Sequence, residues 1–135
     1  MSWPVLLTSL TAALEADVAI VADVLRGARA EVFERPTVLV SRRGGQPRQA
    51  TDWAGGAERF WLECWHYNTT PETADTDLEA LESAVQACVH AWLDSAPVAG
   101  LVITGEVTDI TADEDTFRPS VGSRMALDLA WRQVP

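Results

Sequence analysis

Two Cys-x-His pairs carry the strongest chemical signal in this 135-residue sequence. Cys64 precedes His66, Cys88 precedes His90, and the chain has no other cysteine or histidine. Two cysteines and two histidines are a set that can bind zinc. The second pair lies in a helical pattern, however, where residues two apart point about 200° away from each other. The sequence therefore predicts buried, reduced thiols and no metal site.

Patterns typical of enzymes are missing from the sequence. It contains no phosphate-binding loop and no GxGxxG, GxSxG or HExxH motif. If 58–67 is a strand, Cys64 and His66 lie on one face among Phe60 and Leu62, so they cannot work as a nucleophile and its base. The sequence therefore offers no candidate catalytic residues, and we expect no cofactor.

Three carboxylates are grouped in an acidic turn predicted at 111–116. Asp113, Glu114 and Asp115 could act as general acids or bases, or bind calcium. A turn of this length lacks the ligand pattern of a calcium loop. We favour an ordinary solvated turn.

Segment 42–57 concentrates positive charge in a chain whose net charge is −10. It contains Arg42, Arg43 and Arg48, together with Trp53. Two Gly-Gly pairs and a proline predict a long flexible loop. This loop is either an arm that contacts another protein or a hairpin tip with solvated arginines.

The segment 58–67 alternates as a strand does, with large apolar side chains on both faces. Trp61, Trp65 and Tyr67 share one face with Glu63. Two neighbouring tryptophans at the surface would form a hydrophobic patch, and such patches mark contact surfaces.

The other elements follow from hydrophobic spacing. The pattern predicts a helix over 76–94, started by a Thr76/Glu79 capping box and stopped before Pro97. A helical pattern also runs through 3–26, with a break near 15–17 as an alternative. Strands are expected at 31–34, 37–41, 100–110 and 121–133, the last two as an antiparallel pair.

This order of elements predicts one α+β domain over 1–135. We expect a two-layer sandwich, with a mostly antiparallel sheet of four to five strands and two main helices on one face. No run is apolar and long enough to cross a membrane, which favours a soluble, cytoplasmic protein. The acidic balance argues against binding of nucleic acid through its phosphates.

The chain resembles the tail terminator, or tail-completion, proteins of long-tailed bacteriophages. The residues that carry the resemblance are the strand Glu58–Trp65, the short loop after it and the alanine-rich helix Thr76–Leu93. The segment Leu14–Gly27 is also similar. The resemblance covers nearly the whole chain in length and order of elements, through packing patterns and without a catalytic motif.

The resemblance implies a non-enzymatic virion protein, assembled in the host cytoplasm and placed at the junction of head and tail. Such proteins form a hexameric ring on the tail tube, end its polymerisation and present a surface to the head connector. The implied partners are other copies of the chain, the major tail tube protein and the head-completion protein. DNA passes through such a ring without specific binding.

Local residues suggest how these contacts could be made. The face with Trp61, Trp65 and Tyr67 could meet a neighbouring subunit, because aromatic residues are enriched in interface cores. The arginine loop 42–57 could reach the tube or the neighbour. The acidic turn 111–116 could line the channel, where its charge would repel DNA.

Three other functions remain open. A head-completion or tail-to-head joining protein has the same size and ring geometry. A small hydrolase or ligand-binding α+β domain would need a pocket with convergent polar groups. An acidic DNA mimic would bind a basic DNA-processing protein.

Overall fold

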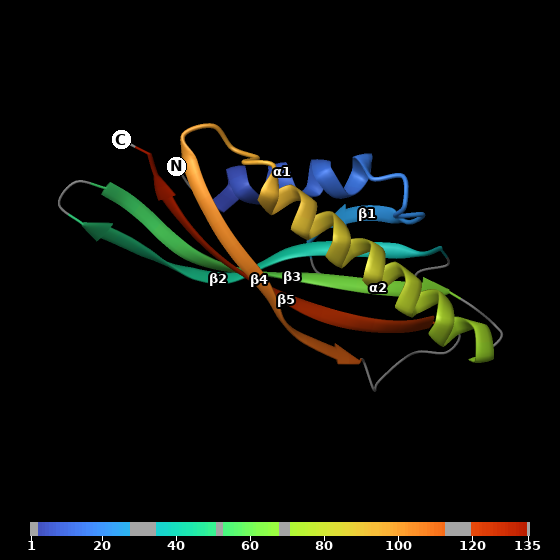
Figure 1. Ribbon diagram of the computed structural model, residues 1–135. Coiled ribbons are helices and arrows are strands. Elements are labelled where there is room, and N and C mark those ends of the chain that lie inside the picture. The colour runs from blue at the N-terminus through green and yellow to red at the C-terminus, as the bar shows by residue number, and fades with distance from the viewer. Residues whose placement is uncertain (1–2, 28–34, 51–52, 68–70, 113–119, 135) are drawn as a thin grey trace.

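The computed structural model describes residues 3–27, 35–50, 53–67, 71–112 and 120–134, with the backbone alone for 47–50, 53–54, 67, 71–72 and 120. Two helices and five strands are present in these parts of the chain, so the α+β class is confirmed (Figure 1). They are α1 (Trp3–Ala16), β1 (Asp23–Arg26), β2 (Thr37–Ala50), β3 (Trp53–Tyr67), α2 (Pro71–Asp94), β4 (Leu101–Ala112) and β5 (Ser120–Gln133).

The five strands form one mixed sheet in the order β1-β2-β3-β5-β4. Only β1 runs parallel to its neighbour; the pairs β2–β3, β3–β5 and β4–β5 are antiparallel. The expected antiparallel pairing of the last two strands is therefore confirmed. Because β3 lies at the centre, both of its faces must be accommodated by the rest of the molecule.

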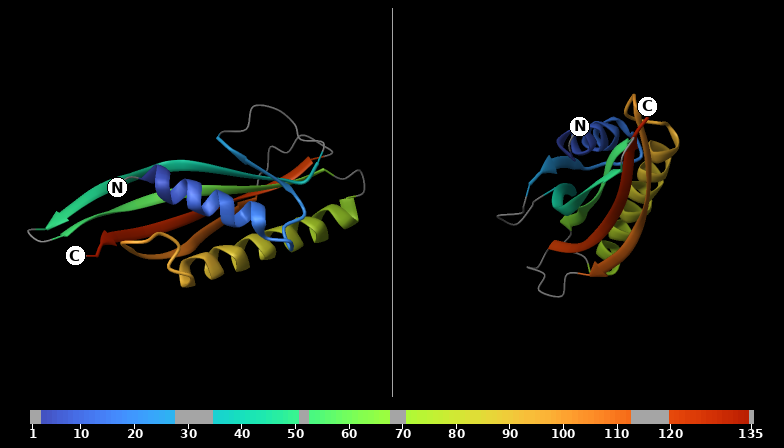
Figure 2. Two further views of the ribbon diagram at one scale, coloured as in Figure 1. Left: turned by 90° about the horizontal axis from the view of Figure 1, so that it is seen from above. Right: turned by 90° about the vertical axis from the view of Figure 1, so that its left-hand side faces the viewer.

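One face of the sheet joins the buried residues of both helices in a single hydrophobic cluster. We call it the core face. Cross-strand register puts its residues side by side: Val38, Val40, Phe60, Leu62, Cys64, Met125, Leu127 and Leu129. Figure 2 shows α1 and α2 side by side along the sheet.

Helix α2 is longer than the sequence pattern predicts. It begins at Pro71, and proline suits a first turn because its missing N–H would have no partner there. Thr76 and Glu79 therefore lie within the helix, and the predicted capping box is wrong. The apolar stripe is as predicted, with buried residues at spacings of three and four: Leu81, Val85, Cys88, Val89 and Trp92.

The N-terminal helical pattern ends sooner than predicted. Helix α1 stops at Ala16, and residues 23–26 form β1 instead of continuing the helix. Val18 is 93% exposed and Val21 is 80% exposed, so neither belongs to an apolar helix face. The backbone N–H of Gly27 donates to the carbonyl of Val40 and extends the parallel pairing, which a helix end at this position would not do.

The predicted flexible loop at 42–57 is wrong. Residues up to Ala50 belong to β2 and residues from Trp53 onward to β3, and the two strands pair from Thr37 opposite Trp65 to Ala50 opposite Trp53, with one bulge at Arg43. The glycines allow close packing: a Cβ at Gly56 would lie 3.0 Å from the Trp131 indole nitrogen and 3.1 Å from the Gln46 carbonyl oxygen. This hairpin projects past both helices, at the left of Figure 1.

Two expectations lie outside the described residues. They are the extended segment 31–34 and the acidic residues Asp113, Glu114 and Asp115 of the turn. Thr111 and Ala112, which the prediction also placed in that turn, are the last residues of β4.

Truncation of Leu81 tests the buried stripe of α2. We expect Leu81→Ala to lower the free energy of unfolding by roughly 2–5 kcal/mol, as truncation of a buried leucine does. The exposed Glu79→Ala on the same helix is the control. Denaturant titration measures both variants, and equal stabilities would mean that the stripe does not support the core.

Candidate functional site

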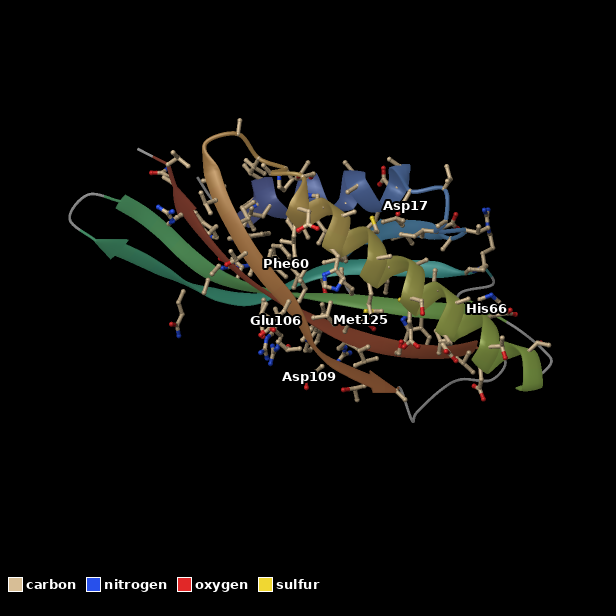
Figure 3. The ribbon with its side chains drawn as sticks, viewed as in Figure 1. Asp17, Phe60, His66, Glu106, Asp109 and Met125 are labelled. Carbon is tan, nitrogen blue, oxygen red and sulfur yellow. The ribbon has the colours of Figure 1, made fainter. Side chains whose placement is uncertain are left out.

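The sheet carries a second set of side chains on the face opposite the core. We call this set the arginine–tryptophan face: Arg43, Arg59, Trp61, Glu63, Trp65, Arg124, Ala126 and Asp128. Register places these residues together, because Trp61 pairs with Ala126 and Glu63 with Arg124. Figure 3 shows Glu106 and Asp109 of β4 pointing away from the helices, and Phe60 and Met125 beneath α2.

Trp61 lies at the centre of this face beneath two guanidinium groups. The Arg124 guanidinium is 3.8 Å from the ring centroid and that of Arg43 is 4.8 Å away. Both distances are within the range of attractive cation–π contacts. Arg43 reaches this ring because a β-bulge leaves it without a residue opposite it in β3.

Glu63 brings a carboxylate into a nearly closed part of the same face. The residue is only 7% exposed, and one of its oxygens lies 3.8 Å from an Arg124 nitrogen. A buried charge is costly unless an opposite charge is near it. Arg124 therefore has two roles, as the ion partner of Glu63 and as the cation over Trp61.

Arg59 and Asp128 form a two-point ion pair across β3 and β5. Arg59 Nε donates to Asp128 Oδ1 at 2.5 Å, and Nη2 donates to Oδ2 at 2.9 Å. This hydrogen bond from Arg59, followed by one from Thr108, holds the pKa of Asp128 below its ordinary value. The hydrogen bond to Asp128, together with its negative charge, raises the pKa of Arg59.

A hollow of about 600 Å³ lies over this face between β3, β5 and β4. Its lining includes Arg59, Trp61, Arg124 and, from β4, Asp109 and Thr111. Both arginines are already engaged by carboxylates of the same chain. This arrangement resembles the pre-ordered arginines and aromatic rings of a protein interface more than a site that activates a reactive group.

The prediction of two exposed neighbouring tryptophans is wrong for Trp65. Trp65 is 2% exposed, whereas Trp61 is partly exposed. The cause is the glycine opposite it in β5: a Cβ at Gly122 would lie 2.4–2.6 Å from ring atoms of Trp65. The indole therefore lies flat against the sheet and contributes little apolar surface.

Arg42 is not a free arm residue. Its guanidinium lies 4.4 Å from the Trp3 ring centroid and donates to both carboxylate oxygens of Glu58, at 3.0 and 3.3 Å. It therefore links the start of α1 to the hairpin on the core face. The side chains of Arg48, Trp53 and Tyr67 lie outside the described residues, and only their places in β2 and β3 are known.

The two Cys-x-His pairs do not converge. Cys88 Sγ donates to the Ala13 carbonyl at 3.5 Å, and His90 is exposed. Burial raises the pKa of Cys64 to about 12 and that of Cys88 to about 11, so both remain thiols near neutral pH. The described residues contain no group of three or more histidine, cysteine or acidic side chains that could hold a metal ion.

Sequence reasoning missed Arg59, Arg124 and Asp128 as site residues. The alternation of 121–133 did place Arg124 and Asp128 on one face, which was a usable signal. The missing information was the register between β3 and β5, which brings Arg59 to Asp128 and Arg124 to Trp61. That register depends on contacts across 60 or more positions of sequence.

Comparisons with protein-family profiles and with curated proteins give no match. In the described part of the chain, neither helix has the length and apolar character required to span a membrane.

Substitution of Arg124 tests the organisation of this face. We expect Arg124→Ala to lower the free energy of unfolding by about 1–3 kcal/mol, because it leaves the buried Glu63 carboxylate without its ion partner. Arg132→Ala, exposed on the same strand, should have a much smaller effect. Replacing Glu63 by Gln in the Arg124→Ala background should recover part of the loss; no recovery would contradict the pairing.

The lowered pKa of Asp128 predicts a specific pH dependence. A depressed carboxyl pKa contributes stability above the unfolded-state pKa, about 3.9, and this stability is lost as the pH falls through the folded-state pKa. Asp128→Asn should therefore be less stable than the wild type at pH 7, and the gap should shrink below about pH 4. Thermal unfolding from pH 2 to 8 measures this; a gap independent of pH would exclude the ion pair as its cause.

Proposed function

We propose that this protein is a structural component of a long-tailed phage. In this proposal it forms a hexameric ring on the tail tube, ends polymerisation of the tube and presents the ring to the head connector. The sequence resemblance supports this function, and the α+β fold agrees with the fold that the resemblance implies. The protein would act by binding alone.

The observation that carries the proposal is the projecting β2–β3 hairpin. Its distal part lies beyond the two helices (Figure 1) and is rich in small residues, with Gly44, Gly45, Gly55 and Gly56. Strand β3 pairs with β5 from Gly55 onward, so within the described residues only the end of the hairpin beyond Gly55 has two strands alone, and a two-stranded hairpin is marginally stable without further packing. A partner that packs against it would explain why the chain makes it so long.

The arginine–tryptophan face supplies a second surface of different character. Ring closure needs a heterologous contact, in which one patch of a subunit meets a different patch of the next. The hairpin and this face are two such patches on one subunit. Arg43 lies where they meet, because it belongs to β2 and its guanidinium covers Trp61.

A small-ligand site is the second candidate, and the hollow of about 600 Å³ favours it. Arginine and tryptophan side chains could hold an anionic aromatic compound there. A head-completion protein shares the ring geometry of the first candidate, and it would bind the portal side of the junction instead of the tube.

Binding to tail tubes tests the proposed function. The purified chain should co-sediment with tubes of the same phage and should stop their elongation when added during polymerisation. Arg43→Ala should weaken tube binding or ring formation without unfolding the protein, whereas Arg35→Ala, which removes an exposed arginine paired with Asp23 before the start of β2, should not. Binding to portal complexes and not to tubes would favour head completion; binding to neither would refute the proposal.

A further inference from the structure

The sheet has three strand edges without an outer partner in the described part of the chain, and the first, that of β1, is only four residues long. The second is that of β4, which pairs only with β5 and does so along its 12 residues except at Thr108, where a bulge interrupts the register. The third is the second part of β2, since β1 covers only Thr37–Val40 and leaves Ser41–Ala50 open on that side. Pro47 lies within this stretch and has no N–H, so an added strand would lack a donor at that position. An open edge presents backbone donors and acceptors that can pair with another strand.

Edge strand β4 is exposed on both faces along most of its length. From Thr104 to Ala112 every residue is exposed except Val107, which is partly buried. Ile110 is 50% exposed. A long strand of this kind aggregates unless something blocks or occupies its edge. Its acidic side chains, Glu106 and Asp109, lie on the same side of the sheet as the arginine–tryptophan face (Figure 3).

The open edge of β2 carries the opposite charge. Arg43 is exposed on it, and its guanidinium lies over Trp61 on the same side of the sheet as Asp109. Two β4 edges would bring carboxylates together, and two β2 edges would bring arginines together, so like pairs are disfavoured. Only β2 against β4 joins opposite charges across neighbouring strands.

Strand direction and length are compatible with this pairing. Within the sheet β2 and β4 run in opposite directions, because three antiparallel steps separate them. A rotation about an axis parallel to the strands preserves these directions, so β4 of the next copy meets β2 in an antiparallel manner. The open stretch Ser41–Ala50 and the 12 residues of β4 are similar in length. Each also contains one bulge, at Arg43 in β2 and at Thr108 in β4, which the pairing has to accommodate.

Among the described residues there is also space beside β2 where β1 ends. A hollow of about 710 Å³ there is lined by residues of β1 and its end, Arg26 and Gly27, and of the β2 edge, Ser41 and Arg43. An added strand alongside Ser41 would continue the line of β1 and would end against this hollow.

We propose that copies of this chain join by strand addition, with β4 of one copy pairing antiparallel to Ser41–Ala50 of the next, and with Glu106 and Asp109 facing Arg43. The contact is heterologous and makes the sheets of successive copies continuous. The proposal deepens the proposed function, because it states how the ring of that function closes, but the self-association can be tested without a phage tail.

Charge reversal tests the pairing in the full purified chain. Sedimentation velocity at low salt should show concentration-dependent association of the wild type, and Arg43→Glu or Asp109→Arg should each weaken it by roughly tenfold or more. An equimolar mixture of the two variants should restore association, because each mutated edge then meets a complementary one. The same restoration is expected for the double variant and shows that neither single change acts by unfolding the protein.

Hydrogen exchange separates strand addition from contact through side chains alone. On association, amides of β4 and of Ser41–Ala50 should gain protection together, and amides on the exposed side of α2 should not. A wild type that stays monomeric at all concentrations, reversal variants that associate normally, a mixture that stays apart, or unprotected edge amides would each overturn the proposal. Association by this route without binding to tail tubes would refute the proposed function and support the strand pairing. Capped tubes without protection of the edge amides would support the proposed function and refute the strand pairing.

Discussion

Alternation along β3 is the constraint on which the rest of this structure depends. This strand is central, and successive residues must go to opposite faces. Phe60, Leu62 and Cys64 enter the core beneath the helices with no measurable exposure. Trp61, Glu63 and Trp65 therefore point to the other face, where they cannot pack against the helices.

The opposite face accommodates these three residues in two ways. A glycine in β5 lets Trp65 lie flat against the sheet. Arg124 serves both Glu63 and Trp61. The resulting surface is ordered by its own ion pairs and has little bare apolar area, so an interface formed there would depend on charge and shape more than on hydrophobic burial. The edges of the sheet are also charged, since β4 carries carboxylates and β2 carries Arg43. A contact at these edges would therefore depend on charge as well.

The strongly periodic parts of the chain could be predicted from sequence. The stripe of α2 and the alternation of β5 both reflect burial on one side, which leaves a local signature. The segment 42–57 could not be predicted, because glycine and proline signal a loop locally, whereas here they permit close packing of neighbouring strands and a bulge. The same holds for residues 23–26: Leu25 continues the helical spacing of Val18 and Val21, but pairing with β2 decides the structure of 23–26.

The candidate site was only half predictable for a similar reason. Its tryptophans were visible in the alternation of β3, but their environment depends on register with β5, and register is set by the whole sheet. Cryo-electron microscopy of phage tail tubes incubated with this chain tests the proposed function most directly. The account predicts one ring of six copies at a tube end, with neighbouring subunits meeting at the sheet edges. Bare tube ends, or single copies scattered along the tube wall, would contradict it.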